Sequence, residues 1–290
     1  MSFSISVNQN QYVTYTLSDE SASSRLEVVP ERGGIVTRWS IQGQELFYLD
    51  QERFTHPELS VRGGNPILFP ICGNLPDDVY AYDGKSYSLK QHGFARNLPW
   101  EVVEQSTESS SKLTISLKSN DETLAVYPFE FQVKFVYELE GKTLKIHQEY
   151  INQSDKVMPL SFGFHPYFLV PDKEKLSLDI PASTYQAKDS TEVVSYKGSF
   201  DFNEDEIDVA LKPLNGSSAS ITDSSRSLKI NLKWSEDFST IVFWTVKGKD
   251  FVCLEPWSAP RNALNTAENL TELQPGASCE ALVEIDVTSL

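Results

Sequence analysis

Alternation of polar and apolar side chains at period two recurs along nearly the whole chain. Residues 112–117 (KLTISL) and 227–232 (SLKINL) alternate residue by residue, which is typical of a half-buried antiparallel strand. Similar runs rich in β-branched and aromatic residues cover residues 12–17, 25–29, 35–41, 131–139, 143–152, 240–245, 251–254 and 280–287. No long window has helical spacing, and residues 259–273 hold at most a short helical turn. About fifteen strands separated by turn signals predict an all-β fold, a large antiparallel β-sandwich.

Turn signals support antiparallel pairing and one continuous domain. Asp83-Gly84 lies between two strand-like runs and predicts a type I′ hairpin, and Glu140-Gly141-Lys142 predicts a second hairpin. The polar stretches at residues 104–111 and 215–220 have the length of loops and not of interdomain linkers. Because β-sandwiches often reach roughly 200–250 residues as one unit, we expect a single domain over residues 1–290.

The composition of the chain disfavours several classes of binding partner. Acidic residues outnumber basic ones by 41 to 25, a net charge of −16, which disfavours nucleic acid and anionic membranes as partners. No apolar run of about eighteen residues is present, so no membrane span is expected. The start of the chain shows no secretory signal, and the three cysteines fit neither a metal motif nor complete disulfide pairing. These features predict a cytoplasmic protein that acts on a small molecule.

Two of the four histidines lie in strings rich in glycine and aromatic residues. His92 lies in QHGFAR at residues 91–96, where a strand gives way to a loop. His165 lies in FGFHPYF at residues 162–168, and the proline after it interrupts strand pairing, which favours a sheet margin or a bulge. Histidine can donate or accept a proton near neutral pH. His92 taken alone is more often a surface or packing histidine, whereas the expected place of His165 at a sheet margin or bulge favours a functional role.

A carboxylate and two arginines complete the candidate site. Glu255, in LEPW at residues 254–257, follows an apolar strand, where a carboxylate must be hydrogen-bonded or have a raised pKa. Trp257 is a candidate to stack on a sugar face, although tryptophan is more often ordinary core. Arg62, before two glycines, and Arg96 are candidates to contact a hydroxyl or a phosphate, or to pair with acids. The composite predicts a proton-transfer site for a polar, ring-shaped substrate.

Four strings in a fixed order resemble the aldose 1-epimerase (galactose mutarotase-like) family. They are RGGNPILFP at residues 62–70, QHGFAR at 91–96, FHPYF at 164–168 and LEPW at 254–257, and the resemblance runs from about residue 31 to residue 284. It implies a β-supersandwich with a sugar cleft, and interconversion of the α and β anomers of an aldose without a cofactor. The chain most resembles members with the string HGFAR, which include hexose-6-phosphate mutarotases. Well-studied galactose mutarotases carry a different string there, so the resemblance does not establish galactose as the substrate.

The resemblance also implies a role for each candidate residue. His165 is expected to be the general acid and Glu255 the general base, as imidazolium and carboxylate, with His92 assisting at the ring oxygen. The residues expected to bind substrate are Arg62, Arg96, Trp257 and an aspartate within residues 200–215, for which Asp208 is preferred over Asp201 and Asp205.

Two other classes of protein remain as alternatives. A carbohydrate-binding protein without turnover would use the same fold, but it would need no acid–base pair. A glycosidase would need two carboxylates flanking the bond, whereas the strongest pair here is a histidine and a glutamate. The histidines also lack the spacing of a metal motif, so no metal and no cofactor are expected.

Overall fold

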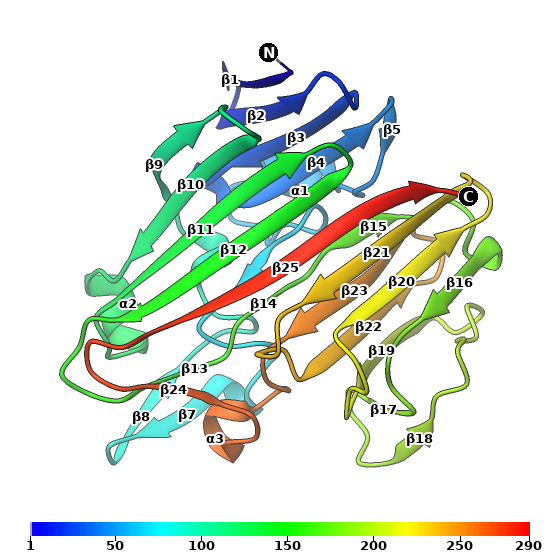
Figure 1. Ribbon diagram of the computed structural model, residues 1–290. Helices are drawn as coiled ribbons and strands as arrows, with labels where there is room; N and C mark the ends of the chain where they lie inside the picture. Colours follow the sequence, from blue (N-terminus) through cyan, green and yellow to red (C-terminus); the bar gives the residue numbers. More distant parts are fainter. Residues whose placement is uncertain (1) are drawn as a thin grey trace.

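Two eight-stranded antiparallel sheets form the body of the protein, and they confirm the predicted all-β sandwich (Figure 1). The computed structural model describes residues 2–290, which contain twenty-five strands. This number exceeds the predicted one because several strands are only two or three residues long, too short to show an alternating pattern.

The first large sheet lies in front in Figure 1 and consists mostly of long strands. In spatial order its strands are β16 (Leu176–Asp179), β20 (Ser218–Asp223), β21 (Leu228–Trp234), β25 (Ser278–Ser289), β12 (Thr143–Asn152), β11 (Phe131–Glu140), β10 (Ser111–Lys118) and β9 (Glu101–Ser106). Pairing of Glu140 with Thr143 closes the predicted β11–β12 hairpin through Gly141 and Lys142.

The second large sheet lies behind the first one in Figure 1 and carries the chemically unusual residues. Its strands are β18 (Val193–Ser195), β17 (Thr184–Ala187), β19 (Glu206–Leu211), β22 (Thr240–Val246), β23 (Phe251–Trp257), β14 (Gly163–Phe164) and β6 (Ile67–Leu68), and β15 (Tyr167–Leu169) also pairs with β23. One edge of β23 is therefore shared by two short strands, β14 and β15, with a break between them.

Smaller elements flank the two large sheets. A five-stranded sheet contains β1 (Phe3–Gln9), β2 (Val13–Asp19), β3 (Ser24–Val29), β4 (Ile35–Ile41) and β5 (Gln44–Glu45). Two ribbons pair β13 (Met158–Leu160) with β24 (Thr271–Leu273), and β7 (Val79–Tyr82) with β8 (Lys85–Ser88). The helices are the short α1 (Gln51–Thr55), α2 (Asp121–Val126) and α3 (Ala263–Thr266), with single 3₁₀ turns at Pro30–Arg32, Pro76–Asp78, Ala95–Asn97 and Lys173–Lys175. The β7–β8 turn has positive φ at both Asp83 and Gly84, as the predicted type I′ hairpin requires.

Strand β23 separates the main core from the candidate site. Val252 and Leu254 are fully buried in the largest hydrophobic cluster, which includes residues from Leu17 to Val287. Successive side chains of a strand point to opposite faces, so Cys253, Glu255 and Trp257 share the other face. The sequence LEPW thus places a carboxylate and an indole on the side of the sheet that faces away from the main core.

Candidate active site

Strand β23 presents Glu255 from the middle of a sheet. The sequence suggests that this strand ends at Leu254, but the strand continues through Pro256 to Trp257, because β22 pairs with it along that length. The Glu255 side chain is 1% exposed. Its Oε2 accepts a hydrogen bond of 3.1 Å from the indole nitrogen of Trp257, two residues along the same face. Trp257 therefore orients the carboxyl group.

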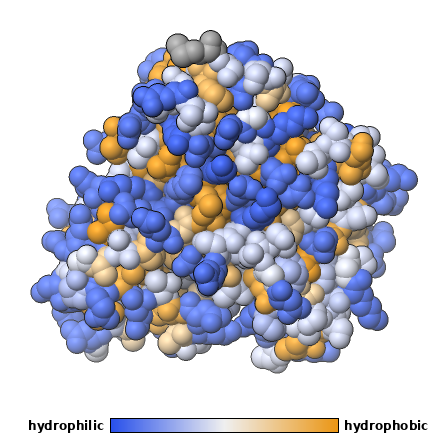
Figure 2. Space-filling view, viewed as in Figure 1, coloured by the Kyte–Doolittle hydropathy of each residue, from blue (hydrophilic) through white to orange (hydrophobic). Residues whose placement is uncertain are grey.

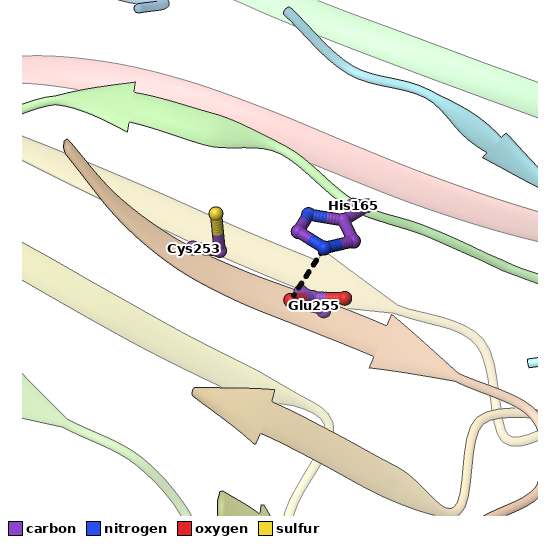
Figure 3. A group of neighbouring side chains, drawn as sticks. All are labelled: His165, Cys253 and Glu255. Atoms are coloured by element: carbon purple, nitrogen blue, oxygen red, sulfur yellow. Dashed lines mark ion pairs between the residues drawn. The ribbon is translucent and has the colours of Figure 1, made fainter. Parts of the chain in front are cut away.

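His165 lies in the break between β14 and β15, as the proline that follows it predicts. Tyr167 pairs with Cys253 on one side of the break, and Gly163 pairs with Trp257 on the other side. This break places the His165 ring opposite Glu255, with Nε2 3.3 Å from Glu255 Oε1 (Figure 3). The ring also stacks on Tyr167 at a centroid distance of 4.7 Å, which fixes its plane. The two residues proposed as acid and base are therefore in direct contact.

His92 is held by two hydrogen bonds to one residue. Its backbone N–H donates to the carbonyl of Gly73 at 2.7 Å, and its Nδ1 accepts from the Gly73 N–H at 3.0 Å. In the neutral ring the proton must therefore be on Nε2, so the ring is a hydrogen-bond donor at that atom. The His92 ring lies 5.4 Å from the His165 ring, centroid to centroid.

The string around His92 also has a structural role. His92 has a φ of +66° and Gly93 a φ of +69°. A Cβ on Gly93 would lie 2.2 Å from the carbonyl oxygen of Phe69, closer than any real contact. Gly93 is therefore required where the chain turns, and this turn brings His92 to the cleft.

A cavity of about 260 Å³ brings all seven predicted site residues together. Its lining includes Arg62, His92, Arg96, His165, Asp208, Glu255 and Trp257. These residues come from five separate segments of the sequence. Neither Asp201 nor Asp205 lines the cavity, and the Asp201 carboxylate instead caps the loop at Asn203.

Asp208 is already engaged by two cations. One of its carboxylate oxygens accepts a hydrogen bond of 2.5 Å from Arg261, and the other lies 3.6 Å from Lys188 Nζ. The Arg261 guanidinium also lies 5.1 Å from the centre of the Trp257 ring. Asp208 thus organises two cations at the cavity wall, and contact of Asp208 with a sugar hydroxyl stays a prediction.

The sequence interpretation did not single out several residues of the cavity wall. Arg261 follows Trp257 by four residues, so extending the LEPW string to residue 261 would have included it. Trp244 and Lys188 lack any local motif. Trp244 reaches the site because it pairs with Asp208 between β22 and β19, a long-range register that no short string specifies.

The cavity is locally basic in an acidic protein. Its wall carries five cationic side chains, Arg53, Arg62, Arg96, Lys188 and Arg261, but only three carboxyl groups, Glu206, Asp208 and Glu255. Buried nitrogens of two of these arginines, Arg96 Nε and Arg261 Nε, have no hydrogen-bond partner, nor does His165 Nδ1. Buried polar atoms are usually paired, so this concentration of free donors is typical of a site that binds a polar ligand.

Burial shifts the protonation of the His165–Glu255 pair toward neutrality. Loss of solvation raises the pKa of Glu255 well above its usual value, and the nearby Asp208 charge adds to the effect. Loss of solvation also lowers the pKa of His165 to about 3, with Arg96 as the next cause. The expected imidazolium and carboxylate are therefore not the favoured form of the free site. The pair instead holds one proton, which is favoured on the carboxyl oxygen.

One group in the described part of the chain has donor atoms close enough to share a metal ion. It consists of His165, Cys253 and Glu255, whose ligand atoms lie within 4.8 Å of one another (Figure 3). This group could not be predicted from the sequence, because His165 is far from the other two residues in the chain.

The fold and the contact between His165 and Glu255 are those expected of an enzyme that isomerises carbohydrates. The family profile described as Aldose 1-epimerase matches residues 13–286, and the chain belongs to this family. It is an isomerase with a β-sandwich fold, as the four strings predicted.

Individual relatives agree with this assignment. The crystal structure of Slr1438 protein from Synechocystis sp. PCC 6803 is 47% identical and superposes with a TM-score of 0.95, covering 99% of each chain. Protein LacX of Lactococcus lactis subsp. lactis is 30% identical over 73% of this chain and 79% of its own length. A relative from Escherichia coli (strain K12) named "Putative glucose-6-phosphate 1-epimerase" is 28% identical over 51% of this chain and 46% of its own length.

Hydropathy of the helices gives one further observation. Within residues 2–290, none of the helices has the length and apolar character needed to cross a bilayer.

Proposed function

We propose that the protein interconverts the α and β anomers of an aldohexose or its 6-phosphate, with His165 as general acid and Glu255 as general base. The observation that carries this proposal is the 3.3 Å contact between His165 Nε2 and Glu255 Oε1 in the cavity wall. The two reacting oxygens of a cyclic aldose are bonded to the same carbon. An acid and a base that touch each other can therefore reach both oxygens at once.

The single proton of the pair is sufficient for the reaction. Ring opening begins when this proton is on His165, a transfer across the 3.3 Å contact that polar sugar hydroxyls in the cleft favour. Glu255 then takes the proton of the anomeric hydroxyl while His165 gives its proton to the ring oxygen, and the C1–O5 bond breaks. Rotation about C1–C2 exposes the other face of the aldehyde, and ring closure returns both protons.

His92 assists this step as a fixed donor. Its Nδ1 is occupied by the Gly73 N–H, so only the Nε2–H is available for the substrate. Burial and the nearby Arg96 keep the pKa of His92 well below its usual value, so the ring stays neutral. A neutral donor can stabilise charge at the ring oxygen without itself giving up a proton.

The geometry argues against the glycosidase alternative. Retaining and inverting glycosidases place two carboxyl groups roughly 5–9.5 Å apart on either side of the scissile bond. Here the second carboxylate, Asp208, is bound to Arg261 and Lys188, and the partner of Glu255 is a histidine. A sugar-binding protein without turnover would gain nothing from burying an acid–base pair at this cost in solvation.

Exchange between anomers tests the proposed activity directly. Two-dimensional exchange NMR on a panel of free and 6-phosphorylated aldohexoses should show faster anomer exchange than buffer for at least one sugar. His165→Asn is the control, because it keeps a polar, hydrogen-bonding side chain but removes the acid. Sugar binding without any acceleration would favour the non-catalytic alternative.

The charge of the cavity supports a phosphorylated substrate. Five cations face three carboxyl groups, one of them favoured in its neutral form, within a chain of net charge −16. Arginine grips phosphate through paired, charge-assisted hydrogen bonds, and Arg96 Nε has no partner of its own. The Escherichia coli relative carries glucose 6-phosphate in its name.

Two arginine variants test this choice of substrate. Arg62→Ala and Arg96→Ala should each reduce kcat/KM for glucose 6-phosphate relative to glucose by about 1.5–3 kcal/mol, the range for a hydrogen bond to a charged group. Arg25→Ala is the matched control, because Arg25 is exposed and its nearest acid is Glu27, outside the cavity. Equal losses for both sugars would assign the arginines to hydroxyl binding or to support of the cavity.

Location and partners complete the proposal. We place the protein in the cytoplasm, acting on small sugars and not on nucleic acid or membranes. The three cysteines are free thiols, which suits a reducing compartment, and the strong negative charge disfavours polyanionic partners.

A further inference from the structure

We propose that His165, Cys253 and Glu255 form a binding site for a thiophilic divalent cation such as Zn²⁺, and that this cation competes with the sugar. The inference depends on a residue that the reaction does not use. Cys253 is fully buried beside the acid and the base, and it is not part of the cavity wall.

Strand geometry brings the three donors together. Cys253 and Glu255 are two residues apart on β23, so their side chains project from the same face of the sheet. His165 comes from the break beside them, where Tyr167 pairs with Cys253. The three ligand atoms lie within 4.8 Å of one another, and His165 Nε2 already lies 3.3 Å from Glu255 (Figure 3). Small side-chain movements would bring all three to one ion.

The chemistry of the donors selects the kind of metal. Thiolate, imidazole and carboxylate are the side chains that bind zinc in proteins, whereas magnesium and calcium prefer oxygen ligands throughout. A Zn²⁺ ion would displace one proton from the Cys253 thiol and one from the Glu255 carboxyl, with His165 neutral. The two negative charges then balance the ion, so the buried complex carries no net charge.

An unpaired buried atom provides an independent indication of a missing ligand. His165 Nδ1 has no hydrogen-bond partner, although the residue is only 8% exposed. Stacking on Tyr167 fixes the plane of the ring, and an ion that lies in this plane can accept the lone pair of a ring nitrogen. Without a metal, Cys253 would serve as a small apolar residue against Tyr167 and Phe251, which is the competing explanation for its burial.

Binding of the ion and catalysis exclude each other. Three protein ligands leave a fourth position, open to the cavity, for water. The ion would occupy Nε2 or Nδ1 of the acid and the carboxylate of the base, so neither group could exchange protons with a sugar. The predicted effect is reversible inhibition by zinc.

Cobalt provides a measurement that does not depend on turnover. Protein freed of metal by a chelator is titrated with Co²⁺, and thiolate-to-cobalt charge transfer is followed by near-ultraviolet absorption. We expect one saturable ion per chain in wild type and in Cys279→Ser, the matched control, and no such band in Cys253→Ser or Cys253→Ala. Circular dichroism establishes that each variant is folded. Absence of the band in wild type, or its persistence in a folded Cys253 variant, would overturn the proposal.

Inhibition of anomer exchange provides the second measurement. The Zn²⁺ concentration for half inhibition should rise at least about tenfold in Cys253→Ser, because even loss of a group that only supports a ligand costs this much. It should stay unchanged in Cys279→Ser. Equal inhibition of all three proteins would contradict the site, whereas a cobalt band in a protein without anomer exchange would overturn only the proposed activity.

Discussion

Charged side chains are buried in the cleft beside β23, whereas they are partly exposed on the outer face of the first large sheet. On that sheet Lys134 of β11 pairs with Glu149 of β12, and Lys134 Nζ lies 3.0 Å from Glu149 Oε2. About a third of each side chain is exposed. Figure 2 shows this side of the molecule as hydrophilic groups interspersed with small apolar patches. In the cleft the Glu255 side chain is 1% exposed, and its contact with His165 is buried.

This difference in burial distinguishes charged side chains that have little effect on folding from those retained for the reaction. Exposed pairs cost little to form and contribute little, because water solvates the separated charges almost as well. A buried carboxyl group and imidazole each lose solvation, and the sheet gains no stability that an apolar pair would not supply. Substitution of a charged group in the cleft is therefore expected to reduce activity strongly. Substitution of a charged group on the outer face is expected to reduce stability only slightly.

Glu255→Gln should have the largest effect. Glutamine keeps the shape of the side chain and can still accept from Trp257, but it cannot take a proton from the sugar. We expect kcat to fall by roughly 10²–10⁴, the usual contribution of a positioned acid or base, while sugar affinity changes only a few-fold. Steady-state polarimetry and sugar titration measure the two quantities.

The outer sheet offers the control for this variant. Glu149→Gln makes the same chemical change at an exposed pair, and it should leave kcat unaltered. If Glu255→Gln retained most of its kcat, Glu255 would not be the base.

Gly93→Ala should have the next largest effect, and it acts on stability. The added Cβ would meet the Phe69 carbonyl oxygen at 2.2 Å, in a residue whose φ is +69°. We expect a loss of about 2–5 kcal/mol in the free energy of unfolding, from the left-handed conformation together with overpacking.

Gly141→Ala, in the β11–β12 hairpin of the first large sheet, isolates the contribution of the left-handed conformation. Gly141 has a φ of +60°, but its Cβ would meet nothing within 4 Å. It should lose only about 1–2 kcal/mol, the conformational cost alone. Urea unfolding measures both variants, and equal losses would show that the turn at His92 and Gly93 can relax.

Lys134→Ala should have the smallest effect. The ion pair with Glu149 is partly exposed, so we expect less than about 1 kcal/mol of lost stability and no change in activity. A loss several times larger in urea unfolding would mean that the outer face also depends on specific charge pairing, and the contrast with the cleft would weaken.

The same contrast explains how much could be predicted from the sequence. Alternation over residues 112–117 and 227–232 identified β10 and β21 because one face of each strand is buried and the other is solvated. The turns at Asp83 and Gly141 were predictable because backbone geometry there restricts residue choice. That residues 1–290 form one domain stays a prediction, and a single cooperative calorimetric transition would support it.

Local strings identified the central residues of the site, but not its surroundings or its charge state. His165 and Glu255 stood out because each lies beside a proline in a string of apolar residues. Lys188 and Trp244 did not, because only the pairing of β17, β19 and β22 brings them to Asp208. The lowered pKa of His165 disfavours the expected imidazolium in the free site, and the sequence could not predict this because it does not reveal how completely the ring is buried.

The pH dependence of anomer exchange tests the central claim most directly. Burial raises the pKa of Glu255 and lowers that of His165 from 6.5 to about 3, so the pair should gain a second proton only in strong acid and lose its single proton only above the usual range of a carboxylic acid. The rate measured by exchange NMR should therefore stay constant as the pH falls past 4.5, where an ordinary glutamate titrates, and it should decline only near pH 3, where His165 takes up the second proton. A rate that declines with falling pH around a midpoint near 4.5 would contradict the account, since it would mean that Glu255 acts as an ordinary, solvated carboxylate.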